Sequence, residues 1–182
     1  MNILFKLTDN DIGMETKLVK EYKTRIAARG IIIRNDGMIG IQRKKNTKEY
    51  KLIGGGIEEG EEPNIAFKRE VLEESGCEIE IIKELGLTEE YITMKDAKQI
   101  SYIFVAKVLK DTNSVQLTEK EKNEGAELIW VTPYEALKLI KDSYMNLVSS
   151  SYSRDYDVYR MKFISLRDSK ILEYYISNCF NK

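Results

Sequence analysis

Three glutamates near the middle of the chain have a spacing that could support metal chemistry. Glu70, Glu73 and Glu74 lie at positions i, i+3 and i+4 of the segment REVLEESG, so a helix would place their carboxylates on one face. Like charges at these spacings destabilise an exposed helix by about 0.2–0.5 kcal/mol per pair. Mg²⁺ and Mn²⁺ prefer oxygen ligands, and either ion would offset this repulsion. The spacing alone leaves two interpretations open, a metal site and a solvated acidic face.

The composition limits which other chemistry is available. The 182 residues include no histidine, which excludes Ser-His triads and histidine metal sites. Acid–base or metal chemistry must therefore use carboxylates, lysines, tyrosines or cysteines. Lys and Arg number 29 against 30 for Asp and Glu, so the composition implies no basic face. We therefore expect no long nucleic acid as a partner.

Several features favour a cytoplasmic protein. Cys77 and Cys179 are the two cysteines, and so few fit a reducing compartment better than a disulfide scaffold. The segment MNILFKLTDNDIG lacks the cationic stretch and the long apolar run of a signal peptide. No apolar stretch approaches the length that spans a membrane, so we expect no membrane association.

The glutamates lie on a predicted helix that follows three consecutive glycines. Pro63 suits the first turn of this helix, and Gly76 suits the position just past its end. Ile65, Val71 and Leu72 fall roughly opposite the glutamates.

Apolar patterns elsewhere predict mainly strands. We expect strands within residues 1–12 and at residues 24–34, 38–43, 50–53, 77–87, 99–109 and 126–131. A helix is expected from residue 133 to about residue 141, and a partly helical segment over residues 157–177. Strands with helices between and after them predict an α+β fold, with a mixed β-sheet and flanking helices.

The residues around the glutamates fit a longer pattern. It consists of a glycine, five residues, a glutamate, seven residues, and then Arg-Glu-apolar-any-Glu-Glu-any-Gly-apolar. Its fixed positions in this chain are Gly55, Glu61, Arg69, Glu70, Glu73, Glu74 and Gly76. This segment resembles the Nudix box, and residues 24–141 resemble a MutT-like Nudix hydrolase. The complete box favours the metal site over the solvated acidic face.

The resemblance implies a fold, a reaction and a cofactor. Nudix hydrolases have an α/β/α sandwich and use Mg²⁺ or Mn²⁺ to hydrolyse a nucleoside diphosphate linked to another group, X. By the resemblance, Glu70, Glu73 and Glu74 are the metal-binding and water-activating carboxylates. The carbonyl of the residue before the box, here Gly54, is a further expected metal ligand.

Other residues of the box are expected to support these carboxylates. By the resemblance, Arg69 acts in catalysis by orienting a glutamate, and Glu61 braces the loop against the helix. Gly55 and Gly76 are structural positions of the box. Glycine also lets the backbone approach metal and phosphates closely, because it has no Cβ.

Some relatives place the catalytic base on a later loop, which corresponds here to residues 118–125. We expect Glu124 to be that base, with Glu121 as the second choice. Arg43 and Tyr50 are candidate substrate-binding residues. For both, a plainer interpretation also stands, an exposed strand end for Arg43 and packing for Tyr50.

The expected organisation is an N-terminal strand and connection over residues 1–23, a Nudix domain over 24–142 and a helical extension over 143–182 that packs on the domain. A monomer and a homodimer both remain open. The substrate is expected to be a small nucleoside-diphosphate compound. The segments expected to select X are residues 44–50, 88–98 and 111–123.

Two other functions are weighed against hydrolysis. A non-catalytic Nudix-like module that binds or senses a nucleotide is the main alternative, although such modules often lose box residues. The isomerase branch of the fold, which acts on isopentenyl diphosphate, binds its metal through histidines. This chain has no histidine, so the isomerase function is set aside.

Overall fold

The computed structural model describes residues 2–145, 147 and 155–180. Its strands are β1 (Ile3–Leu7), β2 (Lys23–Ile33), β3 (Ile39–Lys44), β4 (Glu49–Lys51), β5 (Ile53–Gly56), β6 (Cys77–Ile92), β7 (Ala97–Asp111) and β8 (Ala126–Val131). Its helices are α1 (Pro63–Ser75), α2 (Glu119–Asn123), α3 (Pro133–Met145), α4 (Asp155–Tyr175), the short 3₁₀ turns η1 (Asp9–Ile12) and η2 (Thr93–Lys95), and the π-helical turn η4 (Ile176–Phe180). Residues 146, 148–154, 181 and 182 of the expected C-terminal extension lie outside the described residues.

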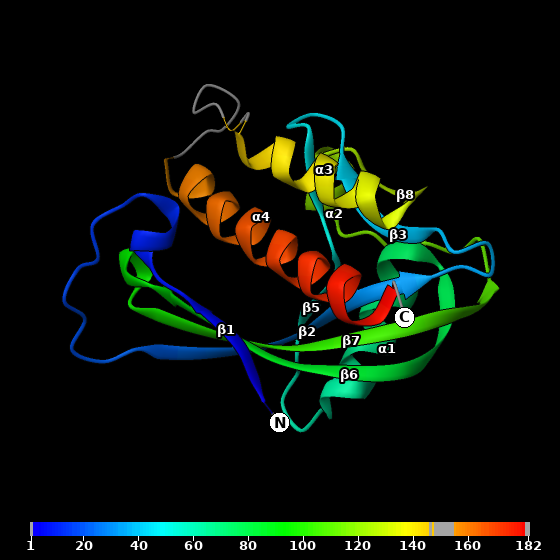
Figure 1. The fold of residues 1–182 in the computed structure, drawn as a ribbon, viewed down its shortest axis with the longest axis horizontal. Helices are drawn as coiled ribbons and strands as arrows, with labels where there is room; N and C mark the ends of the chain where they lie inside the picture. Colours follow the sequence, from blue (N-terminus) through cyan, green and yellow to red (C-terminus); the bar gives the residue numbers. More distant parts are fainter. Residues whose placement is uncertain (1, 146, 148–154, 181–182) are drawn as a thin grey trace.

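The described strands form one mixed sheet. Its main order is β1-β6-β7-β2-β3-β4, with β5 added on β2 and β8 on β3. The pairs β1–β6 and β2–β7 are parallel, and the other pairs are antiparallel. Helices α3 and α4 lie over one face of this sheet and α1 lies on the other (Figure 1). This arrangement confirms the predicted α+β fold with a mixed sheet and flanking helices.

The side chains of strand β2 alternate between the two faces of the sheet and contribute to a separate hydrophobic cluster on each face. Ile31 is fully buried in a cluster with residues of α3 and α4. Ala28 and Ile32 are fully buried in a second cluster, which contains Phe67 of α1. Successive side chains of a strand point to opposite faces. Residues of β2 that lie an even number of positions from Ile31 therefore point to the same face as Ile31, toward α4.

Helix α1 begins and ends where the sequence indicates. Pro63 is its first residue, and Gly76 follows the helix with a φ of 71°. A residue with a side chain is disfavoured at such a left-handed position, whereas glycine adopts it readily. The helix thus has a fixed end immediately before β6.

The apolar residues of α1 opposite the glutamates are not all buried. Val71 is fully buried, but Ile65 is 51% exposed and Leu72 is 36% exposed. Ala66 and Phe67 are fully buried instead. The helix is rotated in this way because its glutamate-bearing side also faces the protein, against strand β5.

The segment expected to be a substrate-selecting loop at residues 88–98 is largely strand. β6 runs on to Ile92 and β7 begins at Ala97, with the turn η2 between them. The end of β6 also pairs in parallel with β1, from Leu87 to Glu90. Because both neighbours supply backbone hydrogen bonds, the hairpin extends further than the local sequence pattern predicts.

The described parts of both chain ends pack on each other. A third core cluster contains Leu7 and Ile12 from the N-terminal end and Tyr159 and Phe163 of α4. The hydroxyl of Tyr159 donates a hydrogen bond to buried Asp9. Helix α4 is thereby fixed over the sheet at the edge of the pocket described below.

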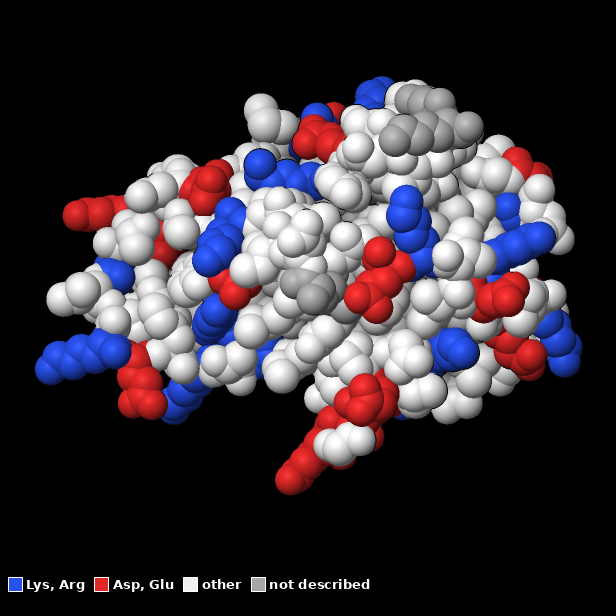
Figure 2. Space-filling model, turned by 60° about the horizontal axis from the view of Figure 1, so that its bottom comes forward, with Lys and Arg blue, Asp and Glu red and all other residues white. Residues whose placement is uncertain are grey.

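The surface carries both kinds of charge. Figure 2 shows Lys and Arg interspersed with Asp and Glu over the face that it displays. Among the described residues, no helix is long and apolar enough to cross a membrane.

Candidate active site

Strand β5 and helix α1 together position Glu74. The Oε2 atom of Glu74 accepts a hydrogen bond from the backbone N–H of Gly54 at 3.0 Å. Its Oε1 atom accepts one from Nζ of Lys51, also at 3.0 Å. Glu74 is only 6% exposed, so this carboxylate is held in place where the glycine strand passes the helix.

Glu70 lies directly over Gly55. A Cβ added to Gly55 would lie 2.4 Å from Oε2 of Glu70, which is far closer than atoms approach one another. Burial raises the pKa of Glu70, and the charges of Glu74 and Glu73 raise it further, against the hydrogen bond from Arg69. The site therefore contains crowded carboxylate charge that the protein neutralises incompletely.

Arg69 connects the box residues to one another. Its Nε and Nη2 atoms both donate to the carboxylate of Glu61, each at 2.9 Å. Its Nη1 atom donates to Glu70 at 2.8 Å and to Glu73 at 3.3 Å, and Nη2 also donates to the carbonyl of Gly56 at 3.0 Å. The hydrogen bond from Arg69 lowers the pKa of Glu61. Arg69 thus orients two glutamates, and Glu61 fixes Arg69.

Glu70, Glu74 and the glycine strand border a pocket of about 390 Å³ between β5, the start of β7 and α4. Charged side chains predominate in its wall. Its lining residues are Arg25, Arg29, Lys44, Lys51, Gly54, Gly55, Gly56, Glu70, Glu74, Glu90, Ile92, Ala97, Lys98, Gln99, Glu121, Tyr156, Arg160, Phe163, Ile164 and Arg167. Glu73, whose side chain is 39% exposed, is not among them.

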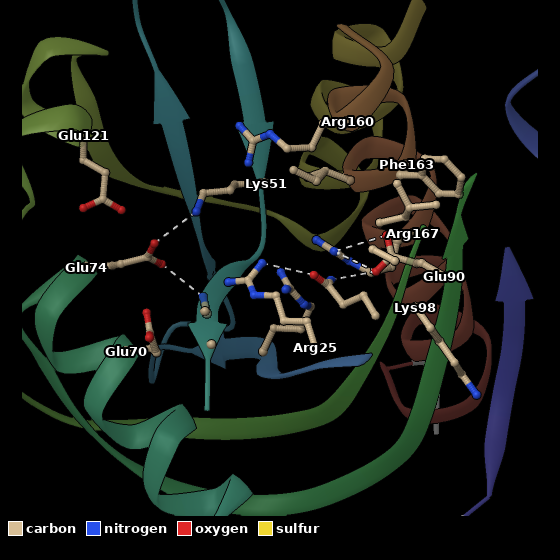
Figure 3. Close-up of a pocket in the computed structure, with 18 of the residues that line it drawn as sticks. Arg25, Lys51, Glu70, Glu74, Glu90, Lys98, Glu121, Arg160, Phe163 and Arg167 are labelled. Atoms are coloured by element: carbon tan, nitrogen blue, oxygen red, sulfur yellow. Dashed lines mark hydrogen bonds and ion pairs between the residues drawn. The ribbon is translucent and has the colours of Figure 1, made fainter. Parts of the chain in front are cut away.

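Most of the carboxylates lie apart from the arginines of α4. In Figure 3, Glu70, Glu74 and Glu121 lie on one side, and Arg160 and Arg167 lie on the other, where Arg167 pairs with Glu90. Lys51 lies between the two sides, where it bonds Glu74. An elongated molecule that carries negative charge could therefore contact a bound cation at one end and guanidinium groups at the other.

The structure places the two candidate bases differently. Glu121 lines the pocket, and Glu124 does not. Burial opposes ionisation of Glu121, but hydrogen bonds from Thr118 and the charge of Lys51 hold its pKa below the ordinary value. Glu124 pairs with Lys44 at 2.6 Å. The helix cap formed by Thr118 turns Glu121 rather than Glu124 toward the pocket.

The two candidate substrate residues also lie outside the pocket lining. Arg43 forms an ion pair with Glu127 of the neighbouring strand β8. Tyr50 packs against the core cluster under α3 and α4. Both placements agree with the plainer interpretations, a strand-end pair and a packing residue.

The carboxylates have the donor chemistry for a divalent cation but are held by cations of the chain. Over residues 2–145, 147 and 155–180, no three acidic, histidine or cysteine side chains converge as a ready metal site. Lys51 bonds Glu74, and Arg69 bonds Glu70 and Glu73. The carboxylate of Glu70, which is incompletely neutralised and lies where a Cβ of Gly55 would be, fits a hard cation.

The fold and the site together define a class of protein, an α+β domain in which an acidic helix lies against a glycine-rich strand. The family model described as NUDIX domain matches residues 23–148. The chain therefore belongs to the Nudix family.

The relatives are similar at low identity. A MutT-like protein of Streptomyces ambofaciens is 28% identical over 119 residues, which cover 65% of this chain and 71% of that protein. Diphosphoinositol polyphosphate phosphohydrolase 2 of Rattus norvegicus is 28% identical over 106 residues, which cover 58% of this chain and 55% of that enzyme. A crystal structure of UDP-X diphosphatase has a TM-score of 0.48 and 17% identity, with 68% of this chain and 64% of that chain covered. The chain thus spans little more than half of the rat enzyme.

Several pocket residues were not expected from the sequence. Lys51, Arg25, Arg29 and Gln99 come from strands, and their meeting depends on sheet pairing. One usable signal was a single arginine, Arg29, inside the apolar segment AARGIII.

A second signal lay in the last long helix. Arg160, Phe163, Ile164 and Arg167 have the spacing i, i+3, i+4 and i+7, which places them on one face of α4. All four line the pocket. Arginines that share a helix face with apolar residues are thus a sequence signal by which this side of the pocket could have been predicted.

Proposed function

We propose that this protein is a divalent-cation-dependent hydrolase that cleaves the pyrophosphate bond of a nucleoside diphosphate linked to another group, X. The observation that carries the proposal is the placement of Glu70 and Glu74 against Gly54 and Gly55 at one side of a charged pocket. Family membership supports it, as does a relative named as a phosphohydrolase of a diphosphorylated compound. The proposed cofactor is Mg²⁺, and Mn²⁺ would serve the same ligands.

The residues of the box divide into cation ligands and supports. Glu70, Glu73, Glu74 and the carbonyl of Gly54 would hold the cation, which would polarise a phosphorus–oxygen bond and activate a water molecule. Arg69 keeps the carboxylates of Glu70 and Glu73 oriented through hydrogen bonds of 2.8 and 3.3 Å.

Two further residues contact the reacting groups in this proposal. Lys51 lies between the two sides of the pocket and supplies positive charge to a phosphate there. Glu121 accepts the proton of the attacking water, since it lines the pocket and its lowered pKa keeps it ionised. We propose Glu121 rather than Glu124 as the base, because Glu124 lies outside the pocket and is paired with Lys44.

The proposal is tested with two isosteric variants, Glu73→Gln and Glu74→Gln. Each removes a negative charge and keeps the side-chain shape, so we expect kcat to fall at least about a hundredfold with little loss of folded structure. The measurement is phosphate release from a panel of nucleoside-diphosphate compounds with Mg²⁺ and with Mn²⁺, together with circular dichroism of each variant.

A matched control is Glu62→Gln, which neutralises an exposed glutamate at the start of α1 outside the pocket lining. Its activity should equal that of the unmodified protein. Full activity in both Glu73→Gln and Glu74→Gln would remove the proposal. Tight nucleotide binding without turnover across the whole panel would instead favour a non-catalytic sensing module.

A further inference from the structure

The wall opposite the glutamates contains a buried arginine that has no carboxylate partner. Arg29 is 5% exposed, and its Nε atom donates to Oγ of Ser101 at 3.3 Å. Within the part of the chain that the structure describes, Arg29 forms no ion pair, and its two Nη groups donate to no protein atom. Burial and the nearby charge of Arg167 lower the pKa of Arg29 to about 10. Asp168 and Glu90 act on this pKa in the opposite direction, but among the described residues neither forms an ion pair with Arg29, so the guanidinium lacks a direct counter-ion.

The carboxylates near Arg29 are already engaged by Arg167. Nη1 of Arg167 lies 3.1 Å from Glu90, and its Nε lies 2.8 Å from Asp168. The other oxygen of Asp168 accepts the backbone N–H of Leu52 at 2.9 Å. Nη2 of Arg167 is itself buried and has no hydrogen-bond partner among the described residues. This network carries one arginine against two carboxylates, so it offsets the charge of Arg29 at a distance, but its hydrogen bonds are directed to Arg167 and leave the Nη groups of Arg29 without an acceptor.

Two more guanidinium groups face the same space. Arg160 of α4 is half-buried and, within residues 2–145, 147 and 155–180, makes no ion pair or hydrogen bond. Arg25 donates from Nη1 to Oε1 of Gln99 at 3.2 Å, which fixes its direction. A Cβ added to Gly56 would lie 3.3 Å from Nη2 of Arg25, so this guanidinium packs against the glycine strand. Figure 3 shows Arg25 and Arg160 on either side of the cavity that Arg167 closes.

Sheet pairing sets this group of arginines beside the glutamates. In the register of β2 with β5, Arg29 is the partner of Gly54, whose N–H bonds Glu74. A pyrophosphate near Glu70 and Glu74 would thus have its attached group directed along β2 toward the arginines.

We propose that Arg25, Arg29 and Arg160 form a second oxyanion subsite, which binds a phosphomonoester carried by one of the two groups attached to the diphosphate, the nucleoside or X. This inference rests on the proposed function and narrows its substrate class to compounds with such an additional phosphate. A phosphomonoester carries a charge of about −1.5 to −2 at pH 7 and offers three acceptor oxygens. Arginine matches this group well, because its planar fork donates two parallel hydrogen bonds to a phosphate.

The first test measures the subsite without catalysis. The full chain is titrated with inorganic phosphate by calorimetry in EDTA, so that no divalent cation can link phosphate to the glutamates. We expect binding that weakens at least about tenfold in Arg29→Gln and in Arg160→Gln, since each removes charge-assisted hydrogen bonds. Arg34→Gln is the matched control, because Arg34 pairs with Asp36 outside the pocket and its loss should leave phosphate binding unchanged.

Arg160→Gln keeps the test decisive if the buried Arg29→Gln variant does not fold. No phosphate binding by the unmodified chain, or equal binding by Arg160→Gln, overturns the inference.

The second test uses matched substrates with Mg²⁺, namely NADPH against NADH and coenzyme A against dephospho-coenzyme A. Within each pair the compounds differ by one phosphomonoester. We expect a higher kcat/KM for the phosphorylated member and a ratio near one in Arg160→Gln. Hydrolysis with no preference in the unmodified protein overturns the subsite and leaves the proposed function standing. No hydrolysis of any diphosphate compound overturns the proposed function, while the phosphate titration still decides the subsite.

Discussion

At the scale of single residues, the missing Cβ of Gly55 has a direct consequence for the site. In Gly55→Ala the new Cβ would lie 2.4 Å from Oε2 of Glu70. The carboxylate is the flexible end of its side chain, so it moves while the backbone stays. We expect Mg²⁺-dependent hydrolysis to fall roughly a hundredfold, as a misplacement of about 1 Å can cost that much, with a nearly unchanged Tm. Steady-state kinetics and thermal unfolding measure the two effects.

The matched control for this variant is Gly56→Ala, in the same strand. Its added Cβ would meet only the flexible end of Arg25, at 3.3 Å. We expect a smaller loss of activity than in Gly55→Ala. Undiminished hydrolysis by Gly55→Ala would show that Glu70 does not act from its position over this glycine.

At the scale of elements, Glu89 joins three strands. It lies on β6 and pairs with Lys98 of β7 at 2.8 Å and with Lys6 of β1 at 3.2 Å. The hydrogen bond from Lys98 lowers the pKa of Glu89 to about 2, helped by Tyr91 and Lys6 against the effect of burial. The ionised form of Glu89 therefore stabilises the edge of the sheet where the pocket hairpin ends.

This pKa shift predicts how stability depends on pH. A carboxyl whose pKa is depressed on folding stabilises the protein above its ordinary pKa, here 4.5, and loses that effect as the pH falls toward about 2. Glu89→Gln should thus lower the free energy of unfolding at pH 7 and lower it less at pH 3. Urea unfolding at both pH values measures the difference.

Glu78→Gln is the control on the same strand. The side chain of Glu78 is exposed, and its ion pair with Lys110 is long, at 3.9 Å, so it should contribute little to stability. A difference between Glu89→Gln and the unmodified protein that stays constant from pH 7 to pH 3 would argue against this electrostatic role.

At the scale of the whole molecule, buried charges attach α4 to the sheet. Asp168 is fully buried and bonds both Arg167 and the backbone N–H of Leu52. Asp168→Ala would leave these buried donors without an acceptor. We expect the free energy of unfolding to fall by about 3–5 kcal/mol, the usual result of removing one partner of a buried ion pair. Urea unfolding of the full chain measures it.

Glu173→Ala provides the comparison on the same helix. Glu173 pairs with Lys141, but the two side chains are 46% and 52% exposed. An exposed pair contributes only about 0–1 kcal/mol, so this variant should unfold almost like the unmodified protein. Equal losses in the two variants would mean that burial does not set the importance of the Asp168 contacts.

Local spacing explains why the helix of the box was predictable. Pro63 and Gly76 mark its two ends within a few residues of sequence, and the structure has the same ends. Its buried face was less predictable, because Ile65 and Leu72 are exposed while Glu74 is buried. Which side of a helix is buried depends on its neighbour, and here the neighbour is a glycine strand that accommodates carboxylates.

Long-range contacts explain why the pocket was harder to predict. Arg25 and Gln99 meet because β2 and β7 pair in parallel, although 74 positions separate them in the chain. Glu121 and Glu124 differ by three positions, and a helix cap at Thr118 decides which one enters the pocket. The first outcome depends on strand pairing between distant segments, whereas the second depends on a local capping box, Thr118 with Glu121, whose residue types were a usable signal.

The sequence by itself determined the fold class, the Nudix family and the glutamates of the box, because these depend on residue types at short fixed spacings. Only the tertiary structure decided that Arg29 and Arg160 share a pocket with Glu70 and Glu74. Strand register and the docking of α4 set that meeting, and both are fixed by packing between segments distant in the chain.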